Sequence, residues 1–194
     1  MIYIDGKLRY NIDETMINLL DLYVDKELSS YEISKIILED EIGKGKKYVL
    51  RLLNRRSYSK YEIINKLKIK GFSKNVISDI IFWLEKKEYI DDELFATMWA
   101  QSRMKNKPIG RYRLNQELKR KGINQEIINK VLDKIYNNVD ELTLARDLVN
   151  KKITSLKLKN ISVNPDRIYN FLLRRGFPRE ISKKIYDDLK NTRV

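Results

Sequence analysis

The feature that most constrains the fold of this chain is an internal repeat centred on three glycines. A basic residue precedes each glycine and an apolar residue follows it, in Lys70-Gly71-Phe72, Lys121-Gly122-Ile123 and Arg175-Gly176-Phe177. The three glycines are 51 and 54 residues apart. Self-similarity at such a period is typical of architectures that repeat one supersecondary unit.

Apolar residues recur at fixed distances around each glycine. At offsets −8, +5, +9 and +13 the three copies carry Ile63, Leu114, Ile168; Val76, Ile127, Ile181; Ile80, Val131, Ile185; and Leu84, Ile135, Leu189. Positions four apart share one helical face, so the pattern predicts a helix on each side of every glycine. The glycine suits the end of the first helix, where a left-handed backbone is cheap only without a Cβ.

Capping residues mark where these helices begin. Before the first helix of the three copies stand the signals Ser59 with Glu62, Pro108 with Gly110, and Asn164 with Pro165. Ser73, Asn124 and Pro178 follow the glycines and suit the start of the second helix. Acids at Asp91-Asp92 and at Asp140 predict a third helix after the first two copies.

The sequence therefore predicts an all-α fold of tandem three-helix, helix-turn-helix-like repeats in an elongated array. We expect repeat 1 over 56–107, repeat 2 over 108–160 and a truncated repeat 3 over 161–194. Residues 1–55 differ: a short β-hairpin is predicted around Asp5-Gly6, with helices over 13–24, 30–39 and 44–54. This acidic segment is either a module that faces a partner or a cap on the array.

Composition excludes several classes of enzyme. The 194 residues include no cysteine and no histidine, which excludes disulfides, Cys/His zinc sites, a cysteine nucleophile and a histidine general base. Gly43-Lys44-Gly45-Lys46-Lys47 only superficially resembles a phosphate-binding loop, so we expect no cofactor and no nucleotide site. No apolar run approaches the ~20 residues of a membrane span, and no signal peptide is visible. We expect a soluble, cytoplasmic monomer with no membrane partner.

Positive charge is concentrated after residue 50. The chain has 40 Lys+Arg and 27 Asp+Glu, a formal net charge of +13; residues 1–50 carry −3 and residues 51–194 carry +16. Such a field attracts polyanions or an acidic protein face. The candidate contact residues lie in the densest window, and are Arg103, Lys105, Lys107, Arg111, Arg113, Lys119 and Arg120. The alternatives are a solvated loop between helices, favourable charges at a helix C-terminus, and the bias of an AT-rich genome.

Two other groups of residues have a structural interpretation that we prefer. Asp91-Asp92-Glu93 could suggest a divalent-metal site, but acids in a first helical turn explain it. Five aromatic residues could stack on bases, although most of them follow the apolar periodicity, which favours packing in the core. They are Phe72, Phe82, Trp83, Phe95 and Trp99, of which Trp83 breaks the apolar face.

The ordered set of motifs resembles the RecX family, bacterial regulators of the RecA recombinase. The matching segments are Arg55-Arg56-Ser57 with Ser59 and Glu62, Lys70-Gly71-Phe72, Tyr89-Ile90-Asp91-Asp92 with Phe95-Ala96, Gly110-Arg111 through Lys121-Gly122-Ile123, and Arg174-Arg175-Gly176-Phe177. The likeness spans residues from about 51 to 190. It implies a protein without enzymatic activity that binds in the groove of RecA–DNA filaments and inhibits extension, ATP hydrolysis and strand exchange.

Three functions remain open at this point. The leading one is a regulator that docks its basic helices on a RecA filament, with single- or double-stranded DNA as a secondary contact. The second is a helix-turn-helix-like protein that binds bare DNA, with a steep dependence on salt. The third is a metal-dependent nuclease that uses Asp91, Asp92 and Glu93.

Overall fold

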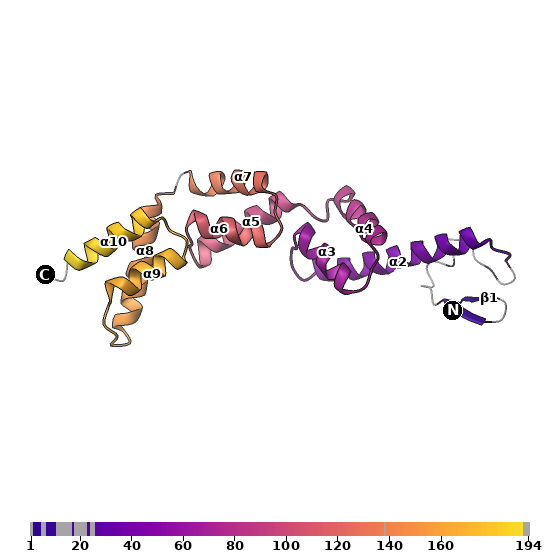
Figure 1. The fold of residues 1–194 in the computed structure, drawn as a ribbon, viewed down its shortest axis with the longest axis horizontal. Coiled ribbons are helices and arrows are strands. Elements are labelled where there is room, and N and C mark those ends of the chain that lie inside the picture. The colour runs from indigo at the N-terminus through magenta and orange to yellow at the C-terminus, as the bar shows by residue number, and fades with distance from the viewer. Residues whose placement is uncertain are drawn as a thin grey trace. The chain divides into compact units, whose positions relative to one another are not determined.

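The computed structural model describes residues 2–4, 7–10, 17, 23, 26–137 and 139–191. Its helices, labelled as in Figure 1, are α2 (Ser30–Leu53), α3 (Lys60–Ile69), α4 (Lys74–Lys86), α5 (Asp92–Asn106), α6 (Arg111–Arg120), α7 (Gln125–Tyr136), α8 (Glu141–Lys157), α9 (Pro165–Arg174) and α10 (Arg179–Asn191). The backbones of β1 (Ile2–Ile4) and β2 (Lys7–Tyr10) pair antiparallel. The Asp5-Gly6 turn lies outside the described residues, as does almost all of the predicted helix over 13–24, so both stay predictions.

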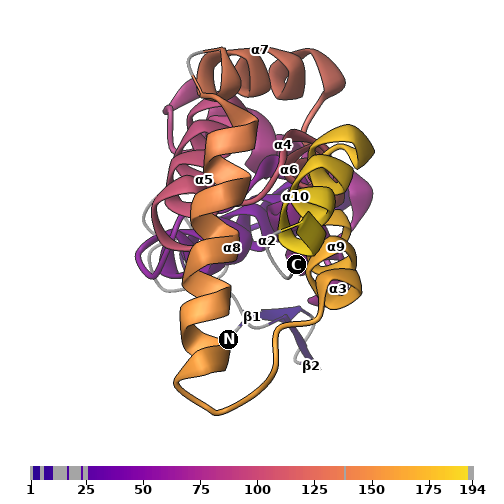
Figure 2. The same cartoon turned by 90° about the vertical axis from the view of Figure 1, so that its left-hand side faces the viewer.

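The chain divides into two compact units that contain three hydrophobic clusters. Unit 1 is Met1–Asp91 and unit 2 is Asp92–Val194. In unit 1 the cluster joins α2, α3 and α4. Unit 2 holds two clusters, one of α5, α6 and α7 and another of α8, α9 and α10. Figure 2 shows α8, α9 and α10 beside one another, in orange and yellow.

These clusters group the helices differently from the repeats predicted over 56–107, 108–160 and 161–194. The predicted repeats place α5 with the helices before it, but its buried residues Phe95, Ala96 and Ala100 pack with Leu114 and Leu118 of α6. In the same way α8 packs with α9 and α10. The last hydrophobic cluster therefore draws on three helices, α8, α9 and α10. An apolar stripe predicts that a helix face is buried, but it does not specify which neighbour covers that face.

The predicted turns and caps are confirmed. The three repeat glycines have positive φ, +89° at Gly71, +75° at Gly122 and +83° at Gly176. Ser59 and Ser73 cap α3 and α4 through their side chains, and Ser59 forms a complete capping box with Glu62. Asn124 caps α7, and Asn164 caps α9 with Pro165 in its first turn. Each group thus keeps the predicted core of helix, glycine turn and helix.

The two helices predicted over 30–39 and 44–54 form one continuous helix, α2. Gly43 lies in the predicted break, yet the helix continues through it. Gly45 is buried, and a Cβ at this position would lie 2.2 Å from Cδ1 of Ile80. The glycine therefore allows α4 to approach α2 closely, and the helical backbone around it does not form a phosphate-binding loop.

Within unit 2, a contact between two glycines joins the second and third groups. The backbone N–H of Gly110, just before α6, donates a 2.9 Å hydrogen bond to the carbonyl oxygen of Arg175 at the end of α9. A Cβ on Gly110 would lie 2.2 Å from the carbonyl oxygen of Gly176, and one on Gly176 would lie 2.4 Å from Cβ of Arg113. The backbones can approach this closely only because neither residue has a side chain.

Candidate nucleic-acid and partner interface

The packing of α5 against α6 determines which way the basic side chains of these two helices face. Leu114 and Leu118, one turn apart, are fully buried in the second cluster. The bases on the rest of α6 are thereby turned outward: Arg111, Arg113, Lys119 and Arg120 are all exposed. On α5, Lys105 is exposed and Arg103 is half-buried, and Lys107 is exposed just beyond the helix.

Two of the predicted contact residues, Arg103 and Arg113, bind the same carboxylate, that of Glu117. Its carboxylate accepts hydrogen bonds from Nε of Arg103 at 2.7 Å, Nε1 of Trp99 at 3.2 Å and Nε of Arg113 at 3.4 Å. The Glu117 side chain is only 11% exposed, so these charge-assisted bonds are partly shielded from water. Arg103 and Arg113 therefore have a structural role, whatever else they contact.

Arg111 and Arg113 also hold neighbouring segments. The Arg111 guanidinium forms an ion pair with Asp133 of α7, and its backbone N–H donates to Glu141 of α8 at 2.9 Å. Nη1 of Arg113 donates to the carbonyl oxygen of Arg174 at 2.6 Å. Three of the seven predicted contact residues are thus engaged inside the protein.

The other four predicted contact residues carry charge that the described part of the chain does not neutralise. The side chains of Lys105, Lys107, Lys119 and Arg120 are exposed and form no hydrogen bond or ion pair with any described residue. Lys121, by contrast, lies over the ring of Trp99 at 4.5 Å. This division is not visible in the sequence, because a basic residue looks the same whether its partner is an acid on another helix or solvent.

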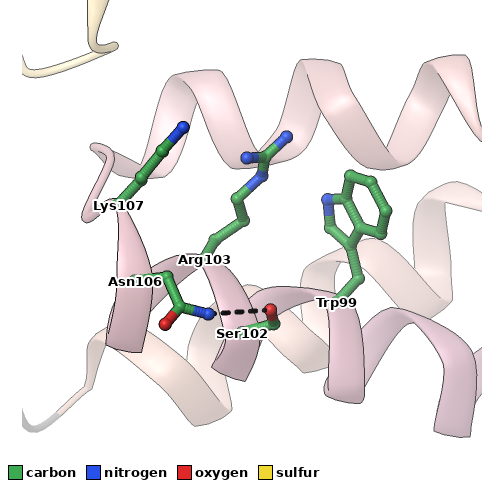
Figure 3. Close-up of a pocket in the computed structure, with 5 residues that line it drawn as sticks. All are labelled: Trp99, Ser102, Arg103, Asn106 and Lys107. Atoms are coloured by element: carbon green, nitrogen blue, oxygen red, sulfur yellow. Dashed lines mark hydrogen bonds between the residues drawn. The ribbon is translucent and has the colours of Figure 1, made fainter.

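This basic face contains two adjoining hollows. The first, on α5, is drawn in Figure 3; Trp99, Arg103 and Lys107 reach the same way, while Ser102 and Asn106 bond to each other. The second is a cleft of about 400 Å³ between α5, α6 and α9. We call it the Arg175 cleft; its lining residues are Arg103, Lys107, Ile109, Arg113, Glu117, Phe171, Arg174 and Arg175. Arg103 and Lys107 belong to both hollows.

Arg174 and Arg175 are site residues that the charge pattern of the sequence does not single out. Both are visible as part of the third glycine motif, but 61 residues separate Arg174 from the Arg113 side chain that bonds to it. Partial burial lowers the pKa of Arg175 from its ordinary value, and repulsion by Arg113 and Arg103 lowers it further. The nearby carboxylate of Glu117 acts in the opposite direction, but it does not offset the combined effect of burial and the two arginines.

Most of the aromatic residues pack as expected, with one exception. Phe95 is buried and stacks on Trp99, with ring centroids 6.1 Å apart. Trp83 and Phe72 are partly buried against the first cluster. The prediction that Phe82 lies in the core is wrong, because this side chain is 66% exposed. It lies between Ile81 and Trp83 on α4, where only one face of the helix meets α2 and α3.

Two of the three-helix groups match models of known protein domains. A model of the first three-helix domain of RecX matches residues 46–84, and a model of the second matches residues 91–132. The Regulatory protein RecX of Caldanaerobacter subterraneus is 28% identical over 183 residues, 94% of this chain and 89% of the relative. That of Chlorobium limicola is 31% identical over 145 residues, 75% of this chain and 89% of the relative.

The chain belongs to the RecX family. The domain boundaries of the RecX models agree with the first two hydrophobic clusters, since the second begins at Asp91, just before α5. A crystal structure of a regulatory protein RecX superposes with a TM-score of 0.72, covering 95% of this chain and 91% of that one at 23% identity. The RecX of Lactobacillus salivarius gives a TM-score of 0.59 over 78% of this chain and 98% of that one, at 26% identity.

Membership of the RecX family makes the chain a regulatory protein and not an enzyme, in the context of DNA recombination and repair. The nuclease considered for Asp91, Asp92 and Glu93 is therefore excluded. Asp92 begins α5, and Oε2 of Glu93 lies 3.7 Å from Nζ of Lys130. Among the described residues, no group of three or more acids is placed to hold a metal ion. None of the described helices is both long and apolar enough to span a membrane.

Proposed function

We propose that this RecX-family chain binds the filament that RecA forms on DNA and restrains its ATPase, recombinase and coprotease activities. The observation that carries the proposal is the basic face of unit 2. It presents four exposed bases without a partner among the described residues, next to a cleft with two further arginines. A nucleoprotein filament offers phosphates and acidic protein surface at a regular spacing, which suits such a face.

The proposal includes how the chain acts. It acts in the cytoplasm as a monomer, and contact with the DNA of the filament is secondary to contact with RecA. An elongated array of the three helical groups remains a prediction from the sequence. Residues 1–55, which carry the acidic end of the chain, are not assigned to either partner.

The direct test is hydrolysis of ATP by the cognate RecA on single-stranded DNA, with this protein titrated in. Half-maximal inhibition at well below one molecule per RecA monomer is the expected result, because one bound regulator would block the changes of many subunits in a filament. No inhibition at saturation, with bare DNA still bound, would reject the proposal.

Variants of the unpartnered bases test the surface without disturbing the fold. We expect the quadruple variant Lys105→Glu, Lys107→Glu, Lys119→Glu, Arg120→Glu to inhibit RecA at least about tenfold less strongly, because reversed charges repel the filament. The same reversal at Arg111 and Arg113 would also break their bonds to Asp133 and Glu117. Unchanged inhibition by a folded quadruple variant would remove this face from the proposal.

Binding to bare DNA is the second candidate, and the Arg175 cleft is the observation that favours it. Helix-turn-helix groups on a basic protein commonly bind DNA. This function predicts tight binding to DNA without RecA and a similar affinity with RecA present. To distinguish the two candidates, the affinity of the regulator for labelled DNA is measured with and without RecA added to the DNA first.

A further inference from the structure

The Arg175 cleft holds more positive charge than its described lining residues neutralise. Five cationic side chains line it and one carboxylate, that of Glu117, faces them. Glu117 is already shared by Arg103 and Arg113. The unbalanced cations are Lys107, Arg174 and Arg175.

These three cations have few partners in the part of the chain that the structure describes. Lys107 and Arg174 are exposed and their side chains contact no described partner. Among the described residues, the Arg175 side chain has one hydrogen-bond partner, the carbonyl oxygen of Pro108 at the long distance of 3.5 Å from Nη1, and its guanidinium lies 5.3 Å from the ring centre of Phe171. Arg175 also feels the repulsion of the positive charges of Arg113 and Arg103, so an anion in the cleft would be strongly attracted.

The arrangement suits a phosphate group better than a carboxylate. The cations come from three places, the end of α5, the first turn of α6 and the end of α9, so they surround a ligand from several sides. A tetrahedral phosphate presents oxygens in several directions, whereas a carboxylate presents two in one plane. Glu117 already fills the position that a carboxylate would take beside Arg103 and Arg113. The volume of about 400 Å³ also exceeds the needs of a single carboxylate.

The α5 hollow beside the cleft indicates that the phosphate belongs to a nucleic-acid strand. Arg103 and Lys107 line both the cleft and the α5 hollow of about 220 Å³, so the two adjoin at these side chains. Figure 3 shows the α5 hollow. The α5 hollow adds neutral hydrogen-bonding groups at Ser102 and Asn106. A free phosphate would use the cleft alone, whereas a nucleic-acid strand would occupy both hollows.

We propose that the Arg175 cleft binds a backbone phosphate of a nucleic-acid strand, with the adjoining nucleotide over the α5 hollow. The inference rests on the proposed function for the presence of DNA in the partner. It goes beyond that function by placing the DNA contact between the second and third helical groups. Neither group contains the site alone.

The experiment compares two double variants of the full chain that remove equal charge. Lys107→Gln/Arg174→Gln removes two exposed, unpartnered cations inside the cleft. Lys105→Gln/Lys119→Gln removes two exposed, unpartnered cations outside it. Binding of labelled oligothymidylate of about 16 nucleotides is measured by anisotropy over a salt series. Circular dichroism and thermal melting confirm that both variants fold.

We expect the cleft variant to bind at least about tenfold more weakly, and its salt slope to fall by about 0.7 for each phosphate that the protein no longer neutralises. The matched variant should bind less than about threefold more weakly, since it changes only the general field. Equal weakening in the two variants would overturn the proposal. So would full competition by inorganic phosphate or by an acidic peptide of equal charge at the concentration of the oligonucleotide.

Inhibition of the RecA ATPase separates this inference from the proposed function. If the cleft variant loses DNA binding but still inhibits RecA, the cleft binds a strand and the filament is recognised elsewhere. If the unaltered protein binds the oligonucleotide through the cleft but never inhibits RecA, the proposed function fails and the site remains. Loss of inhibition with DNA binding intact overturns the cleft as the DNA site.

Discussion

At the scale of single residues, Glu117 decides how much of the basic face is available to a ligand. It is the one acid of the Arg175 cleft and is nearly buried, and it accepts bonds from Trp99, Arg103 and Arg113. The carboxylate therefore has two opposing effects. It stabilises the packing of α5 on α6, and it neutralises cations that a bound anion would otherwise use.

Replacing this carboxylate should separate the two effects. We expect Glu117→Gln to strengthen binding of an oligonucleotide several-fold, because the cleft gains a net positive charge, and to lower the free energy of unfolding by about 1–3 kcal/mol. Asp79→Asn, which makes the same change of charge on an exposed residue of unit 1, is the control. Anisotropy and urea unfolding measure the two quantities; equal affinity gains in both variants would contradict the role of Glu117.

Tyr136 provides a test that depends on pH. Its hydroxyl donates a 2.7 Å hydrogen bond to the carbonyl oxygen of Ile109, and burial, followed by the nearby charge of Glu141, raises the pKa of Tyr136 well above its ordinary value. The unfolded chain ionises this tyrosine near pH 10 while the folded chain keeps it neutral. The stability it contributes is therefore complete below about pH 10 and is lost as the pH rises further.

We expect Tyr136→Phe to cost about 1–3 kcal/mol at pH 7, because the Ile109 carbonyl loses its partner. Above about pH 10 the difference from the unaltered protein should shrink, since the phenylalanine has no proton to lose. Urea unfolding at pH 7, 9 and 11 measures this. A difference that stays constant over the series would show that Tyr136 ionises equally in both states.

At the scale of elements, the sequence predicts where helices begin and turn better than which helices pack together. The glycine turns and the caps at Ser59, Ser73, Asn124 and Asn164 depend on neighbouring residues, so local patterns determine them. Packing partners depend on contacts across long separations. This is why the hydrophobic clusters group α5 and α8 with the helices that follow them, whereas the predicted repeats group them with the helices before. It is also why no sequence pattern marks Arg174 and Arg175 as neighbours of Arg113.

Two glycines in the same repeat position should respond differently to substitution. Gly71 has φ of +89°, and a Cβ there would meet no atom within 4 Å. We therefore expect Gly71→Ala to lower the free energy of unfolding by about 1–2 kcal/mol, the cost of a left-handed backbone for a residue with a Cβ. Gly176 has φ of +83°, and its new Cβ would also lie 2.4 Å from that of Arg113, so Gly176→Ala should cost clearly more.

Each unit contains one of the two tryptophans, so fluorescence can follow each glycine variant in its own unit. Trp83 reports on unit 1 in a Trp99→Phe background, and Trp99 reports on unit 2 in a Trp83→Phe background. Urea unfolding gives the cost of each alanine in kcal/mol. Equal costs at Gly71 and Gly176 would show that the contact with α6 adds nothing.

At the scale of the whole molecule, the composition of the chain determines how pH and salt affect its affinity for DNA. The two relevant features are the high net charge and the absence of histidine. The chain carries +13 and has no histidine or cysteine, so its side chains include no group with an ordinary pKa between about 5 and 8. We expect binding to bare DNA to change little between pH 6 and 8. Between about 50 and 200 mM salt it should weaken about twentyfold for three phosphate contacts. Anisotropy titrations over both series measure this, and a steep pH dependence would contradict it.

The grouping of consecutive helices has a consequence for how the protein is made. Each hydrophobic cluster is complete once its third helix has left the ribosome, so none of the described helices α2 to α10 waits for a distant stretch of chain to cover its apolar face. The Arg175 cleft is different, because it needs α9 and the glycine turn at residue 176. A polypeptide released before that point would contain both domains that the RecX models match, and would still lack its anion site.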